Sequence, residues 1–328
     1  MATYKGIKGV KVQSKASDPT ASEAEGTVWY NSTSPSALKY AIQSAAAWAS
    51  SPSTNTARDA GGSAGTQTAA LYFCGRLPPT TDKCELFNGT AWTEVNNANT
   101  SREYLGGAGT QTAALAIGTL DQSPNLGCET WDGTCWAEGN NVNYVHGGGN
   151  TSGGTATAAI VAGGGWPPPS PYYHAESETY DGTCWTETND MNSATGAMQG
   201  GSSYSSVPGG FGYGGYPAST AFEVYDGTCW SNSTAGGTAR DQGSGAGSNT
   251  AALVWAGNPG HIVNTEQWNG SAWTEMANLA VGRRAASGAG INTAALSIAG
   301  ETPPGSTKNS TCEAFNDPVY TIKTVTVS

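Results

Sequence analysis

The feature that most constrains the fold is a repeat of about 45 residues. Five segments share the pattern Asn/Asp-Gly-Thr/Ser-small residue-Trp, and they end at Trp92, Trp136, Trp185, Trp230 and Trp273. Trp48 belongs to a sixth copy that lacks the glycine turn. Successive tryptophans are 44, 44, 49, 45 and 43 residues apart. A fixed period of this length indicates supersecondary units that stack on one another, with the tryptophans as structural aromatics between them.

Charged residues keep register with the tryptophans. A Glu lies seven residues before five of the tryptophans, and a sixth Glu lies at the same position of a last, partial repeat. An Arg lies ten residues after four of the tryptophans. The acidic set is Glu85, Glu129, Glu178, Glu223, Glu266 and Glu313, and the basic set is Arg58, Arg102, Arg240 and Arg283. His146 and Thr195 replace the Arg in two repeats. We expect each Glu to bind an Arg or a backbone N–H between neighbouring units, because partly buried carboxylates need partners.

Each repeat predicts four short strands. A Gly/Ala-rich strand is followed by an apolar Thr-Ala-Ala-Leu/Ile strand, a Glu-x-aromatic strand and the tryptophan strand. The Asn-Gly or Asp-Gly between the last two favours a type I′ hairpin turn. Four-stranded antiparallel units of this period predict an all-β chain that forms a six-bladed β-propeller with short N- and C-terminal extensions.

Counting strands indicates how the ring would close. Third strands number six, but only five fourth strands follow a third strand, so Ala45–Ser50 is expected to complete the last blade. Val319–Ile322 competes for this place, because Tyr320 lies seven residues after Glu313. The predicted organisation is an N-terminal anchoring arm (1–40), the propeller (41–318) and a C-terminal strand (319–328). The two ends are expected to pair with each other or to extend a partner's sheet.

Charge and cysteine usage exclude several classes of function. The formal net charge of −11 disfavours binding to nucleic acid, and no apolar run is long enough to insert into a membrane. Seven cysteines without a CxxC motif and three dispersed histidines predict no metal site and no cofactor. The cysteines alternate with Ala and Thr between repeats, which indicates buried thiols. Cys74–Cys84 and Cys128–Cys135 remain the candidate disulfides.

Two aromatic segments depart from the repeat pattern and are the candidate binding surface. One contains Trp166, Tyr172, Tyr173 and His174, and the other contains Phe211, Tyr213 and Tyr216. Prolines and glycines around them predict neighbouring loops that present aromatic rings to a sugar or a protein. The alternative is that these rings cover one end of the propeller or pack on a neighbouring subunit.

The repeat elements, including Gly107–Leu115, resemble those of kelch/galactose-oxidase-like propellers. The particular residues of the repeats, and the opening segment Met1–Ile7, also resemble virion proteins of tailed phages from marine and cyanobacterial settings. The fourth repeat departs from the pattern, since it lacks Thr-Ala-Ala-Leu. The resemblance implies a non-enzymatic structural or adhesion protein at the particle surface, as a capsid decoration, head fibre or tail fibre component. Its partners would be other virion proteins bound through both termini, and a host glycan or protein, within an oligomeric or symmetric assembly.

Two other functions fit the expected fold. A carbohydrate-binding propeller lectin would use the aromatic segments directly. A copper-dependent oxidase-like enzyme would need clustered Tyr and His ligands, but His146, His174 and His261 fall at different places in the repeat. No nucleophile or phosphate-loop motif appears in the chain. The sequence therefore predicts a protein that is not an enzyme.

Overall fold

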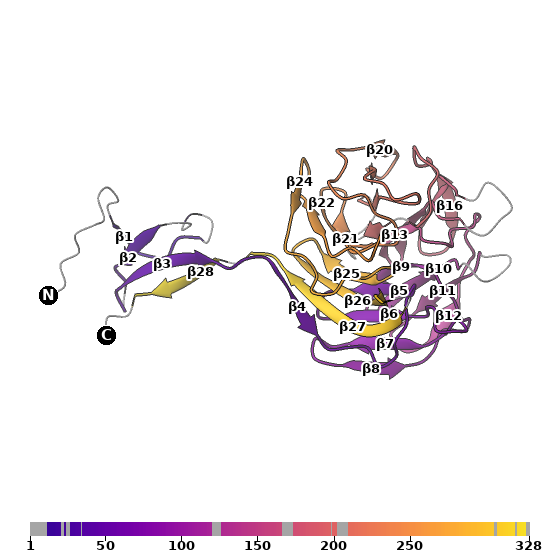
Figure 1. The fold of residues 1–328 in the computed structure, drawn as a ribbon, viewed down its shortest axis with the longest axis horizontal. Coiled ribbons are helices and arrows are strands. Elements are labelled where there is room, and N and C mark those ends of the chain that lie inside the picture. The colour runs from indigo at the N-terminus through magenta and orange to yellow at the C-terminus, as the bar shows by residue number, and fades with distance from the viewer. Residues whose placement is uncertain are drawn as a thin grey trace. The chain divides into compact units, whose positions relative to one another are not determined.

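A computed structural model describes residues 12–20, 23, 27–33, 35–119, 126–165, 173–197, 199–201, 209–304, 307–318 and 320–325. Within these residues, 28 strands form seven four-stranded sheets. The chain divides into two compact units (Figure 1). One unit is Ala47–Asn316, which contains six of the sheets, and the other joins Met1–Ala46 to Asp317–Ser328.

The first three sheets of the larger unit follow the repeats in chain order. The first contains β5 (Gly62–Gly65), β6 (Ala70–Phe73), β7 (Cys84–Phe87) and β8 (Trp92–Val95). The second contains β9 (Gly106–Thr110), β10 (Ala113–Ile117), β11 (Cys128–Trp131) and β12 (Trp136–Glu138). The third contains β13 (Thr151–Thr155), β14 (Ala158–Ala162), β15 (Ser177–Tyr180) and β16 (Trp185–Thr188).

The other three sheets continue this order, and the last recruits a strand from the beginning of the unit. The fourth contains β17 (Gln199–Gly201), β18 (Phe211–Tyr213), β19 (Phe222–Tyr225) and β20 (Trp230–Asn232). The fifth contains β21 (Ser244–Ser248), β22 (Ala251–Trp255), β23 (Thr265–Trp268) and β24 (Trp273–Glu275). The sixth contains β25 (Ser287–Ile291), β26 (Ala294–Thr302), β27 (Thr307–Asn316) and β4 (Ala47–Ser51).

Every one of these six sheets is antiparallel throughout, as the four-strand interpretation of the repeat predicts. Of the two segments predicted to supply the fourth strand of the last sheet, β4 does so. It pairs with β27, and Trp48 lies opposite Phe315. The competing segment forms β28 (Tyr320–Thr324), which pairs with β3 (Ala37–Gln43) in the other unit. The N-terminal strand of the larger unit thus completes the sheet begun by its last repeat.

The hairpin between the third and fourth strands differs from the predicted type I′ turn. Phe87 pairs directly with Trp92, which leaves a four-residue loop. Gly89 in this loop has a positive φ of 89°, whereas the φ of Asn88 is not positive, as a type I′ turn would require. The Asn88 side-chain oxygen instead accepts the backbone N–H groups of Thr90 and Ala91. The prediction of turn type was wrong because this side chain makes the turn bonds itself.

The core lies between neighbouring sheets, where the repeat tryptophans pack against the preceding sheet. Trp136 of the second sheet lies 5.0 Å from Phe73 of the first, measured between ring centroids. Trp48 of the sixth sheet lies 5.2 Å from Trp255 of the fifth. Burial of these rings stabilises the stack of sheets, since a four-stranded sheet alone leaves both faces in water.

The first strands of the sheets contact one another in a closed series, from β5 through β9, β13, β17, β21 and β25 back to β5. Just before these strands, backbone N–H groups donate to the preceding sheet: Ala60 to Ala285, Tyr104 to Ala60, Ala197 to Gly148, Gln242 to Ala197 and Ala285 to Gln242. All five donor residues have positive φ, between 47° and 54°. The left-handed backbone turns each N–H toward the neighbouring sheet.

The seventh sheet joins both ends of the chain. It has the order β1 (Gln13–Lys15), β2 (Val28–Asn31), β3 and β28, with β1 and β2 parallel. Trp29 is buried on one face, where Asp18 accepts hydrogen bonds from the Trp29 indole and the Asn31 amide. The sequence left open whether the ends pair with each other or with a partner, and in the structure they pair with each other.

Candidate functional site

In four of the six repeats the Arg and Glu form an ion pair within one sheet, whereas the sequence predicted pairs between neighbouring units. Arg58 lies in the connection that leads into β5, and its Nη1 is 2.6 Å from Glu85 Oε1 on β7, with both side chains fully buried. The equivalent distances are 3.0 Å for Arg102–Glu129, 2.8 Å for Arg240–Glu266 and 2.6 Å for Arg283–Glu313. Three of these Arg side chains also donate to the carbonyl of the residue that follows the second strand, as Arg58 does to Cys74, and Arg283 donates to Ala299 within β26. The pairs fasten an incoming connection to its own sheet.

Repeats three and four hold the Glu differently. His146 Nε2 lies 3.2 Å from Glu178 Oε1, and His146 Nδ1 lies 2.7 Å from the Gly163 carbonyl. Burial opposes ionisation of Glu178, but hydrogen bonds from His146, Asn143 and Tyr144 outweigh it and lower the Glu178 pKa. Glu223 accepts the backbone N–H and the amide of Asn192, and Thr195 stands in the Arg position of this repeat.

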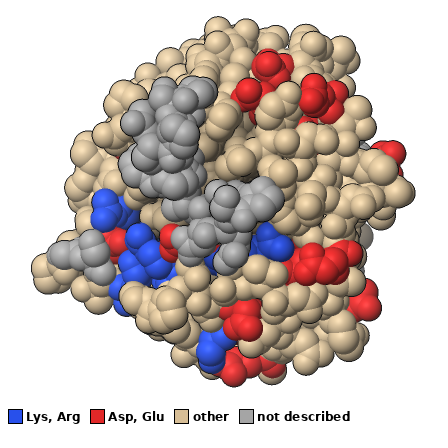
Figure 2. Space-filling model, turned by 90° about the vertical axis from the view of Figure 1, so that its right-hand side faces the viewer, with Lys and Arg blue, Asp and Glu red and all other residues tan. Residues whose placement is uncertain are grey.

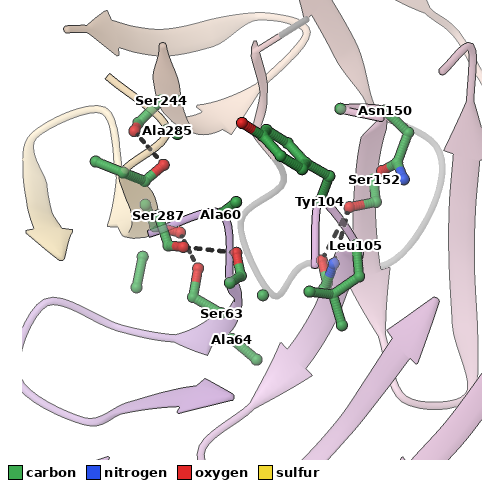
Figure 3. Close-up of a pocket in the computed structure, with 18 of the residues that line it drawn as sticks. Ala60, Ser63, Ala64, Tyr104, Leu105, Asn150, Ser152, Ser244, Ala285 and Ser287 are labelled. Atoms are coloured by element: carbon green, nitrogen blue, oxygen red, sulfur yellow. Dashed lines mark hydrogen bonds between the residues drawn. The ribbon is translucent and has the colours of Figure 1, made fainter. Parts of the chain in front are cut away.

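A polar cavity lies between the first strands of the sheets. It has a volume of about 130 Å³, and β5, β9, β13, β21 and β25 contribute to its wall. Its polar side chains are five hydroxyl groups and two carboxamides, from Ser63, Ser152, Ser244, Ser287, Tyr104, Asn150 and Gln242. Figure 3 labels all of these except Gln242. Most of the rest of the lining is Gly and Ala, because neighbouring strands approach too closely for larger side chains: a Cβ on Gly107 would lie 2.4 Å from the Ser63 carbonyl oxygen.

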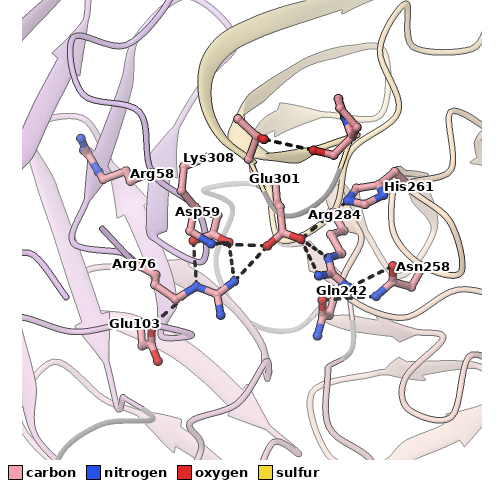
Figure 4. Close-up of polar contacts among 12 residues, drawn as sticks. Arg58, Asp59, Arg76, Glu103, Gln242, Asn258, His261, Arg284, Glu301 and Lys308 are labelled. Atoms are coloured by element: carbon pink, nitrogen blue, oxygen red, sulfur yellow. Dashed lines mark hydrogen bonds and ion pairs between the residues drawn. The ribbon is translucent and has the colours of Figure 1, made fainter. Parts of the chain in front are cut away.

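An ion-pair cluster adjoins the cavity through Ala60 and Ala285, which line it (Figure 4). Arg76 Nη2 lies 2.6 Å from Asp59 Oδ2 and 3.1 Å from Glu301 Oε2. Lys308 Nζ lies 3.0 Å from Asp59 and 3.4 Å from Glu301. Asp59 precedes β5, while Glu301 and Lys308 belong to β26 and β27. The cluster therefore links the first sheet to the last, and its two buried carboxylates are both matched by cations.

Sequence reasoning missed this cluster and the polar lining of the cavity. A signal existed, because the residue directly after the Arg position is charged in all four Arg-containing repeats. These residues are Asp59, Glu103, Asp241 and Arg284. The partners Arg76, Glu301 and Lys308 fall outside the repeat pattern, and only the closed arrangement of sheets brings them together.

The two aromatic segments meet at one place. Tyr173 and Tyr216 have ring centroids 6.0 Å apart, and Tyr216 is 55% exposed. His174 Nδ1 lies 3.3 Å from Glu176. Trp166 and Tyr172 lie outside the described residues.

Phe211 and Tyr213 need a correction. Both are fully buried in β18 and cannot present their rings to a ligand at the surface. The sequence interpretation placed them in a loop because the fourth repeat lacks Thr-Ala-Ala-Leu. In the structure they fill the place of that strand, where their rings pack on Phe222 of β19.

All seven cysteines are free thiols, so neither candidate disulfide forms. Cys74, Cys84, Cys128 and Cys312 are buried, as predicted. Cys135 and Cys184 are exposed and Cys229 is intermediate, because the position before the tryptophan lies in the outer hairpin turn. The prediction of burial was wrong for this set.

Two further findings concern metals and membranes. Within the described ranges, no group of three or more His, Cys, Asp and Glu residues could hold a metal ion. Among the same residues, no helix is long and apolar enough to cross a membrane.

Comparison with known proteins bears on the fold. No family model matches the chain, and no curated protein matches it. Among solved structures, the chain is similar to YjhT, with a TM-score of 0.62 over 82% of this chain and 96% of YjhT. Sequence identity is 14%, so the likeness concerns the fold alone. Together with the repeated four-stranded sheets, it fits a β-propeller.

Proposed function

We propose that this protein is a non-enzymatic display and attachment protein of a phage particle, in which a six-bladed propeller is carried on an anchoring terminal unit. The observation that carries the proposal is the joining of both chain ends in one small sheet, β1-β2-β3-β28, which is compact by itself. A compact unit built from the segments on both sides of the propeller in the sequence could serve attachment by itself, so the propeller loops need not do so.

Six blades are favoured by two independent features. The first strands contact one another in a series of six that returns to its start, and five backbone hydrogen bonds follow the same series. The seventh sheet belongs to the other unit, and its β1–β2 pair is parallel, unlike any pair in the six. We therefore count it as the anchor and not as a blade.

Charge supports separate roles for the two units. Residues 47–316 hold eight Lys and Arg against 21 Asp and Glu, a formal charge of −13, whereas the terminal unit holds six against four, which gives +2. Figure 2 shows a face on which the Lys and Arg atoms lie mostly together while the acidic atoms are spread. A mildly basic anchor suits a particle surface of opposite charge, and an acidic propeller resists self-association.

The ion-pair cluster supports a non-enzymatic role. Asp59 and Glu301 are buried beside Arg76 and Lys308, so their charges are compensated within the protein. Such pairing is typical of structural networks, whereas acid–base catalysis needs a carboxyl group poised to exchange a proton.

The test is a phage that encodes the chain without residues 1–46 and 317–328. We expect the isolated 47–316 segment to keep its β-sheet circular dichroism spectrum, and we expect purified particles to lack it on immunoblots. Incorporation at the level of the full chain would contradict the anchoring role. Loss of the spectrum would instead contradict the independence of the propeller.

A carbohydrate-binding lectin is the second candidate, and the contact between Tyr173 and Tyr216 favours it. Paired aromatic rings with one exposed member can stack on sugar rings. A glycan array with the full chain and with Tyr216→Ala tests this function. Binding that disappears in the variant supports a lectin, and a blank array for the full chain contradicts it.

A further inference from the structure

His146 occupies a position that four other repeats give to Arg, and it is fully buried. Both of its ring nitrogens face an acceptor. Nδ1 lies 2.7 Å from the Gly163 carbonyl oxygen, and Nε2 lies 3.2 Å from Glu178 Oε1. Because a carbonyl oxygen can only accept, Nδ1 carries a hydrogen. Whether Nε2 also carries one depends on the protonation state of Glu178.

The groups bonded to the Glu178 side chain show that it is a carboxylate. The backbone N–H of Asn143 lies 2.9 Å from both oxygens, that of Tyr144 lies 2.9 Å from Oε1, and the Asn143 amide lies 2.7 Å from Oε2. A protonated carboxyl group would direct its own hydrogen at these donors. Burial opposes ionisation, but the hydrogen bonds lower the Glu178 pKa. Nε2 therefore also carries a hydrogen, since its lone pair would otherwise face a carboxylate in a site that solvent does not reach.

We propose that His146 is doubly protonated in the folded chain and that its ion pair with Glu178 is a pH-sensitive switch, which holds the connection into β13 against β15 until the proton is lost. The imidazolium takes the place of the guanidinium in the Arg-containing repeats. Arg stays charged at any pH near neutrality, whereas imidazole does not. The fourth repeat has Thr195 at this position, so loss of the proton leaves two successive repeats without a cation there.

The surroundings of the ion pair favour the proton. The other charged and titratable groups near it are Glu187 on β16, Glu176, Tyr144, His174, Cys128 on β11 and Arg102. A hydrogen bond to Glu187 raises the pKa of the Tyr144 phenol and burial raises that of the Cys128 thiol, so both are neutral. Arg102 is already paired with Glu129. The nearby carboxylates add negative charge, which stabilises an imidazolium.

The proton determines the sign of the pH dependence. Above about pH 7 an unfolded chain has released its imidazole protons, whereas the folded chain must keep one for the ion pair to hold. The stability that the pair contributes is therefore complete in mild acid and is lost as the pH rises. While the folded chain keeps the proton, the unfolding equilibrium constant should rise about tenfold for each pH unit. The switch is independent of the attachment role, because it lies within residues 47–316.

Urea unfolding of the full chain from pH 6 to pH 9, at constant ionic strength, tests the switch. His146→Arg supplies a cation that does not titrate. The unfolding constant of the unchanged chain should therefore rise about tenfold more than that of His146→Arg between pH 7 and pH 9. The buried cysteines also ionise on unfolding at high pH, but they are the same in both chains, so the difference isolates His146. The matched control His174→Asn, at a partly exposed histidine, should follow the unchanged chain.

A second measurement detects the proton directly, in the unchanged chain. After labelling with 15N-histidine, the chain gives nuclear magnetic resonance signals from three imidazole rings, and His174→Asn and His261→Asn assign the third to His146. We expect both ring nitrogens of His146 to be protonated at pH 7. A neutral His146 ring in the folded chain at pH 7, or parallel pH profiles for the unchanged chain and His146→Arg, would overturn the proposal. A merely structural role of His146 would leave its ring neutral.

Discussion

Arg58 and Glu85 form an ion pair in which neither side chain has any exposure to solvent, with 2.6 Å between Nη1 and Oε1. Removing one charge from such a pair strands the other in the interior, at a cost of about 3–5 kcal/mol. We therefore expect Glu85→Gln to lower the free energy of unfolding by about 3 kcal/mol, measured by urea denaturation followed by circular dichroism.

The fourth repeat supplies the control for this prediction. Glu223 accepts hydrogen bonds from Asn192, and its Arg position is occupied by Thr195. Glu223→Gln keeps an acceptor and strands no cation, so it should cost about 1 kcal/mol. Equal losses in the two variants would show that the buried cation does not determine the effect.

The free energy of unfolding should depend on pH through the carboxyl group of Glu178. Its pKa is lowered in the folded protein because hydrogen bonds from His146, Asn143 and Tyr144 outweigh the effect of burial. A lowered pKa means that its contribution is complete above the ordinary carboxyl range and is lost as the pH falls through the folded value. The unchanged chain should thus lose more stability between pH 6 and pH 3 than Glu178→Gln does, measured by urea denaturation at each pH. Parallel pH profiles of the two proteins would refute this.

The hydrogen-bonded series before the first strands predicts an unusual effect of glycine. Ala285 has φ of 47°, a left-handed conformation that strains any residue with a Cβ. Ala289 lies in β25 at an ordinary strand position and is equally buried. Relief of strain should offset the entropic cost of glycine at the first position only. Ala285→Gly is therefore expected to be about 1 kcal/mol more stable than Ala289→Gly in urea titrations.

Trp48 closes the last sheet, and its removal should weaken the whole propeller. Its ring packs on Trp255 and Phe315, and its Nε1 donates to Thr265 Oγ1 at 2.9 Å. Trp48→Ala should cost about 3 kcal/mol, typical of large aromatic truncations. Near-UV circular dichroism reports this, since it follows the packed tryptophans. Ile322→Ala, in the strand that competed for the same place, should leave the propeller transition unchanged.

Reactivity of the cysteines should follow their exposure. Burial raises the pKa of the Cys84 and Cys312 thiols to about 11, and Cys74 and Cys128 are raised as well. A thiol reagent should therefore label Cys135 and Cys184 rapidly and Cys229 more slowly, and it should reach the other four only after unfolding. Fewer than seven reactive thiols in denaturant without reductant would indicate a disulfide.

Local pattern was enough to predict most of the fold. The tryptophan period, the Glu-x-aromatic strand and the count of fourth strands led to four-stranded sheets and to Trp48 in the last of them. Turn chemistry was less predictable, because the Asn88 side chain replaces backbone bonds that an Asn-Gly rule assumes. The prediction for the fourth repeat was wrong because Phe211 and Tyr213 form a buried strand, although the Gly- and Tyr-rich sequence around them is typical of a loop.

The candidate site was mostly beyond prediction, since its parts are distant in the chain. Arg76 and Glu301 are 225 residues apart and follow no common pattern. The cavity is lined by serines and glycines, whose ordinary appearance in a Gly-rich sequence carries no signal. Ser63, Ser287 and Asn150 line the same cavity only because the sheets are arranged around one centre.

The pairing of β4 with β27 has a consequence for biosynthesis. Residues 47–51 leave the ribosome early, but their partner, residues 312–316, is among the last segments to be translated. Until residues 312–316 are synthesised, β4 has no partner strand, and its unpaired edge can pair incorrectly with another chain. A chain that stops before residues 312–316 lacks the partner strand of β4, so its last sheet stays incomplete.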